Sequence, residues 1–171
     1  MNARWADITG CGVVAGDRHT VADFSRAILG GESLIGPFVD DFRATSGMPE
    51  DQASLNLRYT KGAPVRDFDP KAHFDDRTLA GLDVFARYAA VAARQAWKES
   101  GLDLDPPKPS RVGVVIGSAN GGQDVLSEGW RRLLLENRKP YPLTIPMTMA
   151  NAAASRIARE ITAHGLSLIH I

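Results

Sequence analysis

The amino-acid sequence predicts an α/β domain in which helices pack against a mostly parallel sheet. Two short β-branched runs, at 7–14 and 111–116, are predicted to be strands, and alanine-rich helices alternate with them. A glycine-rich loop, GSANGG at 117–122, follows the second run directly. Open α/β sheets present their ligand sites at the carboxyl ends of strands, so this loop is the first place to expect one.

Composition and charge exclude several classes of function. The 171 residues include 20 Lys and Arg and 20 Asp and Glu, so the formal net charge is zero, whereas an electrostatic nucleic-acid binder needs a basic excess. No apolar run is long enough to span a membrane, and no secretory signal is visible. A single cysteine excludes an internal disulfide framework and a multi-thiolate metal site. We expect a cytoplasmic protein that needs no metal or cofactor.

The first predicted elements are a strand at 7–14 and a helix. Thr20 is a suitable N-cap, apolar residues then recur at helical spacing, and Gly30 and Gly31 are expected to end the helix.

The next stretch is predicted to be mostly irregular. Residues 33–39 read as a short strand with a turn at Gly36 and Pro37. Residues 40–62 are polar and are expected to form a surface excursion with one helical turn. Residues 63–73 contain two prolines, which disfavour a helix, and are predicted to be extended.

The strongest helical pattern covers 78–100. Its apolar face is mostly alanine, which allows another backbone to approach closely. Asp75 or Asp76 is expected to cap its start, and Asp83 and Arg87 are expected to pair across one turn.

The last third is predicted to hold the buried strand at 111–116, covered on both faces, and two helices. The first helix is expected at 124–137. Three prolines at 139–146 argue against helix there, and Thr148 is a suitable cap for a second helix at 149–162.

Few residues suggest chemistry on their own. Cys11 is interpreted as a buried core cysteine, because free cysteines are commonly buried and inert. The glycine-rich loop matches neither a P-loop nor a dinucleotide fingerprint, so a ligand-contacting loop and a tight structural turn remain equally open. A helix cap and a solvated turn explain the acidic pairs at 75–76 and 40–41. The histidines show no metal-ligand spacing; they are His19, His73, His164 and His170.

Five segments together resemble the β-ketoacyl-acyl-carrier-protein synthases, condensing enzymes of the thiolase-like fold. The segments follow the family's order over about residues 5–165. They are ITGCGVVAG at 8–16, FDP at 68–70, LDVFARYAAVAARQAWKESGL at 82–102, RVGVVIGSANGG at 111–122 and IPMTMANAAASRIA at 145–158. The resemblance implies the N-terminal half of a thiolase-like layered fold.

The resemblance also implies an activity and partners. Members of the family are acyltransferases that move an acyl group from a carrier protein to a cysteine and then condense it with a decarboxylating malonyl thioester. In this family, two histidines and an oxyanion hole stabilise the negative charge that develops during the reaction. The expected partners are acyl carrier protein, acyl and malonyl thioesters, and a second subunit in a homodimer or heterodimer. The expected pathway is fatty acid or polyketide and polyene biosynthesis.

The sequence departs from the family at its end. In the family, the nucleophilic cysteine follows shortly after the turn matched here by His164 and Gly165, but this sequence reads GLSLIHI. We expect residues 1–165 to be an N-terminal β-ketoacyl synthase domain without the cysteine or the two histidines, and therefore inactive alone. Residues 166–171 equal the translation of a transposase adapter end used in sequencing libraries, and we expect them to be non-native.

Two positions are matched to the family's acyl pocket. Asn120 stands where the family often has an apolar pocket residue, and Leu143 and Thr144 stand where it often has aromatic residues near the pocket and dimer contact. Asn120 and Thr144 are therefore the expected substrate-binding residues. They favour a shorter, unsaturated or oxygenated acyl chain. The alternative for Asn120 is that it merely favours a positive φ in the turn.

Two other functions are kept as alternatives. One is a non-catalytic chain-length partner subunit, which lacks the cysteine and would be distinguished by the residue at the nucleophile position. The other is a nucleotide-binding module built on the glycine-rich loop.

Overall fold

The computed structural model describes residues 5–38, 58–103, 105–165 and 167–170. The chain divides into two compact units, one formed by residues 13–68 and the other by residues 1–12 with 69–171. Most of the polar excursion expected at 40–62 lies outside the described residues.

The smaller unit contains α1 (Val21–Leu29) and a two-stranded antiparallel ribbon of β1 (Gly36–Pro37) and β2 (Lys61–Gly62). Thr20 caps α1 as predicted, its hydroxyl oxygen accepting from the N–H of Asp23. The turn predicted at residues 36 and 37 is wrong, because both residues pair with β2. Proline is tolerated in so short a ribbon, where few ladder hydrogen bonds are needed.

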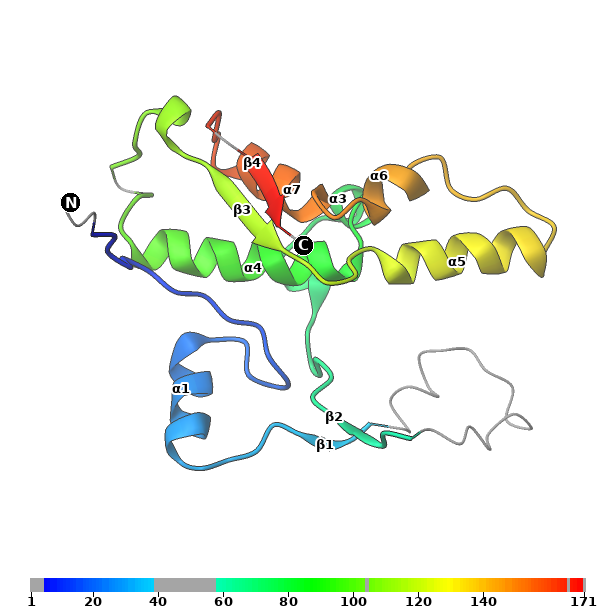
Figure 1. The fold of residues 1–171 in the computed structure, drawn as a ribbon, viewed down its shortest axis with the longest axis horizontal. Helices are drawn as coiled ribbons and strands as arrows, with labels where there is room; N and C mark the ends of the chain where they lie inside the picture. The colour runs from blue at the N-terminus through cyan, green and yellow to red at the C-terminus, as the bar shows by residue number, and fades with distance from the viewer. Residues whose placement is uncertain (1–4, 39–57, 104, 166, 171) are drawn as a thin grey trace. The chain divides into compact units, whose positions relative to one another are not determined.

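The larger unit is built around α4 (Val84–Glu99) and α7 (Ala152–Glu160), which pack against each other. Figure 1 shows β3 (Val114–Gly117) and β4 (Ser167–His170) beside α7, paired in parallel with Val114 opposite Ser167. The sheet is small, and the packing of α7 against β3 agrees with the predicted fold class of a sheet covered by helices. The buried side chains at the helix interface are Ala86, Ala90, Val91, Ala153, Ala154 and Ile157.

Five further helices of the described residues complete the larger unit. They are η2 (Pro70–Ala72), α3 (Asp76–Leu79), η3 (Pro109–Arg111), α5 (Gln123–Leu134) and α6 (Thr144–Thr148). Two of them contradict the expectation that proline prevents helix, since Pro70 begins η2 and Pro146 lies in the first turn of α6. A proline in a first turn removes only an N–H that would have no helical partner there.

The helix predicted at 78–100 is broken into α3 and α4. Asp75 caps α3 as expected, but Asp83 begins a second helix instead of pairing with Arg87. The Arg87 guanidinium donates to the carbonyl oxygens of Leu79 and Leu82, across the break. The expected cap at Thr148 is also wrong: Thr148 ends α6, and Asn151 precedes α7 without a side-chain cap.

The strand predicted at 7–14 is not formed. These residues make no ladder with any described strand, and Gly10 and Gly12 instead lie against α4. Gly10 and Gly12 lie so close to that helix that a Cβ would stand 2.2 Å from the carbonyl oxygen of Ala96 and 1.8 Å from that of Ala92. Successive side chains of an extended segment point to opposite sides, so Cys11 faces away from α4. Cys11 is therefore exposed, and its interpretation as a core residue is wrong.

The strand at 111–116 is present but is buried on one face only. β3 packs against α7, and Val114 on this side is buried, whereas the neighbouring Val115 is 55% exposed. The prediction of a strand covered on both faces is therefore wrong for the described chain.

A buried carboxylate, that of Asp83, connects the starts of two helices. Asp83 is 2% exposed, and its Oδ1 accepts from the N–H of Phe85 in the first turn of α4, at 3.2 Å. Its Oδ2 accepts from the N–H of Val125 in the first turn of α5, at 2.9 Å. The residue preceding α5 is Gly122, which has no side chain to cap it. Asp83 therefore supplies the cap that α5 lacks in its own sequence.

A second polar contact links α4 to α7. The Arg94 guanidinium donates to both carboxylate oxygens of Glu160, at 2.8 and 2.6 Å, and Arg156 donates to Glu160 at 2.7 Å. Burial would raise the pKa of Glu160, but the hydrogen bonds from the two arginines outweigh it and hold the pKa below its usual value.

We predict that Asp83→Ala lowers the free energy of unfolding by about 2 kcal/mol, because two helices each lose a cap that is worth roughly 1 kcal/mol. Asp75→Ala is the matched control, since the Asp75 carboxylate caps only the four-residue α3. Urea denaturation followed by circular dichroism compares the two variants. An Asp83 variant no less stable than the Asp75 variant would contradict the double cap.

The lowered pKa of Glu160 makes stability depend on pH. Its ionised form is favoured in the folded chain, so its contribution is complete above about pH 4.5, the ordinary glutamate value, and is lost as pH falls through the lower folded pKa. Glu160→Gln should therefore cost about 1–2 kcal/mol at pH 7 and progressively less in acid. Urea titrations at pH 7, 5 and 3.5 measure this difference, and a cost independent of pH would oppose it.

Candidate functional site

The glycine-rich loop follows β3 at Gly117 and leads into α5. Its last glycine, Gly122, has φ +76°, a conformation that side chains rarely adopt. A Cβ on Gly121 would lie 2.9 Å from the Phe85 ring, and one on Gly122 would lie 2.3 Å from the Cα of Thr148. Both glycines therefore allow α4 and α6 to pack against the loop. Of the two readings left open by the sequence, this close packing supports the structural turn and leaves no phosphate cradle at these two glycines.

Asn120 lies in this loop and is exposed. Its Oδ1 accepts from Nε2 of Gln123 at 2.9 Å, which fixes the amide against the first turn of α5. The positive φ of the loop falls on Gly122 and not on Asn120. The explanation of Asn120 as a residue chosen for a positive φ is therefore wrong.

Thr144 lies at the start of α6 and is 7% exposed. It lines a cavity of about 260 Å³ between the start of α4, α5 and α6. Gly129 of α5 is buried beside it, and a Cβ there would lie 3.2 Å from Cγ2 of Thr144, so the two helices approach closely. The other lining residues are Asp83, Val84, Arg87, Asp124, Val125, Glu128, Arg132, Tyr141 and Met147. Asn120 is not among them, so the structure does not bring the two expected substrate-binding residues to one cavity.

Charged groups concentrate in the wall of this cavity. Burial raises the pKa of Asp124, and the nearby carboxylate of Asp83 raises it further, against the opposing charge of Arg87. Burial also raises the pKa of Tyr88, with Asp124 adding to the shift. Nε of Arg132 is buried without a hydrogen-bond partner among the described residues. The cavity thus combines a mostly apolar surface with charged side chains in its wall, next to the glycine-rich loop.

The groups expected for nucleophilic or metal chemistry do not form a centre. Cys11 is exposed, and its backbone N–H donates to Glu99 at 2.5 Å. His19 lies against Phe68 in the smaller unit, with its ring nitrogen 3.3 Å from the carbonyl oxygen of Gly16. Within the described ranges, no three His, Cys, Asp or Glu side chains are close enough to hold a metal ion. Nor is any described helix long and apolar enough to cross a membrane.

Two features of the larger unit are not predicted from the sequence. The helical pattern at 78–100 predicts Asp83 inside a helix, although an aspartate two residues before Phe85 and close after Gly81 is a signal for a new N-cap. The second is a group of arginines on α3 and α7. Arg156 and Arg159 are three residues apart and therefore share a helix face, but their approach to Arg77 depends on the tertiary structure.

Comparison with known proteins gives a consistent assignment. The family model "Beta-ketoacyl synthase, N-terminal domain" matches residues 7–170. The 3-oxoacyl-[acyl-carrier-protein] synthase 2 of Coxiella burnetii (strain RSA 493 / Nine Mile phase I) is 36% identical over 159 residues, which cover 92% of this chain and 36% of that protein. Nodulation protein E of Rhizobium sp. (strain N33) is 28% identical, with 92% and 37% covered. The chain thus spans little more than a third of these curated relatives.

Solved structures show the same fold. The ishigamide ketosynthase/chain length factor superposes with a TM-score of 0.76 at 19% identity, covering 95% of this chain and 38% of that one. A β-ketoacyl synthase from Burkholderia phymatum STM815 superposes with a TM-score of 0.70 at 16% identity, covering 94% and 38%. These likenesses confirm the predicted thiolase-like fold of an N-terminal half. Since the family model spans nearly all of the sequence, the chain belongs to the β-ketoacyl synthase family and corresponds to its N-terminal domain.

Proposed function

We propose that this chain is the N-terminal part of a 3-oxoacyl-acyl-carrier-protein synthase, an acyltransferase of fatty acid or polyketide and polyene biosynthesis. The observation that carries the proposal is the match to the N-terminal β-ketoacyl synthase model over residues 7–170. The 36% identity to a 3-oxoacyl-[acyl-carrier-protein] synthase 2 supports the same activity.

The proposed reaction has two stages. A cysteine thiolate attacks the acyl thioester of a carrier protein, and the carrier's thiol leaves as the acyl-enzyme forms. A malonyl thioester then loses carbon dioxide, and its carbanion attacks the acyl carbonyl. The products are a 3-oxoacyl thioester and the free thiolate. Two histidines and an oxyanion hole of N–H groups stabilise the charge that develops.

In this proposal the described chain supplies a wall of the site and not the nucleophile. Cys11 lies on the extended segment along α4 and is not assigned as that nucleophile. We propose that residues 1–165 are the N-terminal domain, and that the reactive cysteine and both histidines belong to the longer protein. The 36% coverage of the Coxiella burnetii relative supports this division. We also propose that residues 166–171, which include β4, are adapter-derived.

Asn120 and Thr144 are proposed to contact the acyl chain. Asn120 is exposed at the carboxyl end of β3, and Thr144 is buried in the cavity wall. Polar groups are costly to bury against a saturated chain, so we propose a shorter, unsaturated or oxygenated acyl substrate.

The proposed partners are an acyl carrier protein, acyl and malonyl thioesters, and a second subunit. One structural neighbour is a type II polyketide acyl-carrier protein in complex with its ketosynthase, and another is a ketosynthase/chain length factor. A cytoplasmic location is part of the same proposal.

A chain-length partner subunit is the second candidate. It is favoured by the neighbours that are ketosynthase/chain length factors, with TM-scores of 0.76 and 0.63. A nucleotide-binding module has no such support, because α4 and α6 pack directly on Gly121 and Gly122.

Sequencing genomic DNA past the Gly165 codon tests the domain boundary and separates the two candidates. We expect the reading frame to diverge from LSLIHI after Gly165 and to continue to a strand that ends in a cysteine flanked by small residues. Glutamine or another residue at that position would favour the chain-length partner. Genomic DNA that encodes LSLIHI followed by a stop codon would refute the proposed non-native tail.

Substitution in the longer protein tests the acyl preference. Asn120→Leu should raise the ratio of kcat/KM for a saturated twelve-carbon acyl thioester over a six-carbon one by roughly tenfold, since it removes an amide that the longer acyl chain would have to desolvate. Ser127→Leu, on the exposed side of α5, is the control and should leave the ratio unchanged. Equal ratios of kcat/KM for the wild type and the Asn120 variant would refute the proposed contact between Asn120 and the acyl chain.

A further inference from the structure

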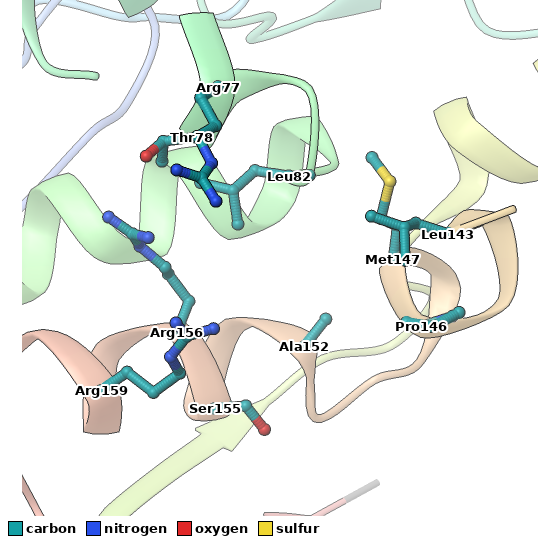
Figure 2. Close-up of a pocket in the computed structure, with 11 residues that line it drawn as sticks. Arg77, Thr78, Leu82, Leu143, Pro146, Met147, Ala152, Ser155, Arg156 and Arg159 are labelled. Carbon is teal, nitrogen blue, oxygen red and sulfur yellow. The ribbon is translucent and has the colours of Figure 1, made fainter. Parts of the chain in front are cut away.

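A larger cavity, of about 610 Å³, lies between α3, α6 and α7 (Figure 2). Neither Asn120 nor Thr144 lines it, and it shares only Met147 with the smaller cavity near the glycine-rich loop. The proposed condensation makes no use of this space. Its volume is within the range of small-molecule sites, about 300–1,000 Å³.

One end of the cavity is cationic. Arg77 of α3 and Arg156 and Arg159 of α7 line it, and no acidic residue does. Arg156 is engaged by Glu160, but no carboxylate in the described part of the chain forms an ion pair with Arg77 or Arg159. Two guanidinium groups are therefore available to an anion. Arginine suits carboxylates because its planar donors can bind both oxygens at once.

A neighbouring carboxylate responds to this positive charge. The pKa of Asp75 is lowered, first by hydrogen bonds from Thr78 and then by the charges of Arg156 and Arg77. Oδ1 of Asp75 caps α3 by accepting from the Thr78 N–H at 2.6 Å. Among the described residues Asp75 forms no ion pair with Arg77 or Arg159, so the positive charge of Arg77 influences it only from a distance.

The other end of the cavity is apolar. Leu143, Pro146 and Met147 form this wall on α6, and Leu82 and Ala152 lie between it and the arginines, as Figure 2 shows. Leu143 is 44% exposed, so this wall is accessible to a ligand. A ligand that matches this cavity has an anionic group for the arginine end and an apolar chain for the α6 wall.

We propose that this cavity binds an amphipathic anion, a medium-chain alkyl carboxylate. The head group would lie between Arg77 and Arg159, and the alkyl chain would run past Leu82 to the α6 wall. A neutral alkyl chain would not form hydrogen bonds and ion pairs with the two guanidinium groups, and a short anion would not cover the apolar wall. Both the carboxylate and the alkyl chain are therefore needed for affinity.

Isothermal titration calorimetry of the 171-residue chain with decanoate, kept below its micelle concentration, tests this site. We expect saturable binding of one decanoate, with decanol and acetate each at least tenfold weaker. The double variant Arg77→Gln, Arg159→Gln should bind decanoate at least tenfold more weakly. Lys108→Gln removes one positive charge from an exposed position outside the cavity and should bind as the wild type does.

A series from hexanoate to decanoate on the unmodified chain is a second measurement that needs no variant. Affinity should rise about threefold with each methylene that contacts the apolar wall. Far-UV circular dichroism of the double variant should match the wild type, because both arginines are exposed. The proposed site would be refuted by any of three results. They are an affinity that does not depend on chain length, decanol binding as tight as that of decanoate, and a double variant that binds decanoate as the wild type does.

Discussion

The arrangement of the larger unit depends on the buried carboxylate of Asp83. A helix start leaves several N–H groups without partners, and α5 begins with a glycine that cannot satisfy them. Asp83 accepts from the first turns of α4 and α5 together. Val125, just after the glycine-rich loop, is thereby tied to Asp83 at the start of the alanine-rich helix, 42 residues earlier in the sequence. The position of Asn120 relative to α4 follows from this pair of hydrogen bonds.

Close backbone contact is the second constraint, and small residues make it possible. Ala86 and Ala90 of α4 meet Ala153 and Ala154 of α7, all of them fully buried. In the glycine-rich loop, Gly121 and Gly122 likewise allow close contact, with Phe85 and Thr148 respectively. Such contacts bury little apolar area per residue, so polar contacts between the same helices make a larger share of the stabilisation. The contact of Arg94 with Glu160 is one of them.

Local patterns predicted well the parts of the fold that are decided locally. Thr20 and the periodicity behind it predicted α1, and the β-branched run before the glycines predicted β3. Features that depend on contacts distant in sequence were not predicted. The exposure of Cys11 follows from glycines on either side of it that face α4. The helix breaks before Asp83, and the Asp83 carboxylate accepts a hydrogen bond from the first turn of α5. The residues next to position 83 in the sequence contain no information about this distant partner.

The site was predicted less completely than the fold. Thr144 does line a cavity, but the resemblance that singled it out carries no information on the charged groups beside it, such as Asp124 and Arg132. The arginines of the larger cavity come from helices 80 residues apart in the sequence, and only the packing of α3 near α7 brings them to one space.

The two glycines of the N-terminal segment have a consequence for how the sequence can vary. Each stands where a side chain would collide with a carbonyl of α4, so the pair Gly10 and Gly12 fixes which residue of the segment faces which turn of the helix. Insertions before Gly10 leave this alignment intact, and the sequence there is free to change in length. A single insertion between the glycines would present a side chain to the helix and push the segment outward. The packing against α4 thus constrains the spacing of the two glycines more than the identity of Cys11 between them.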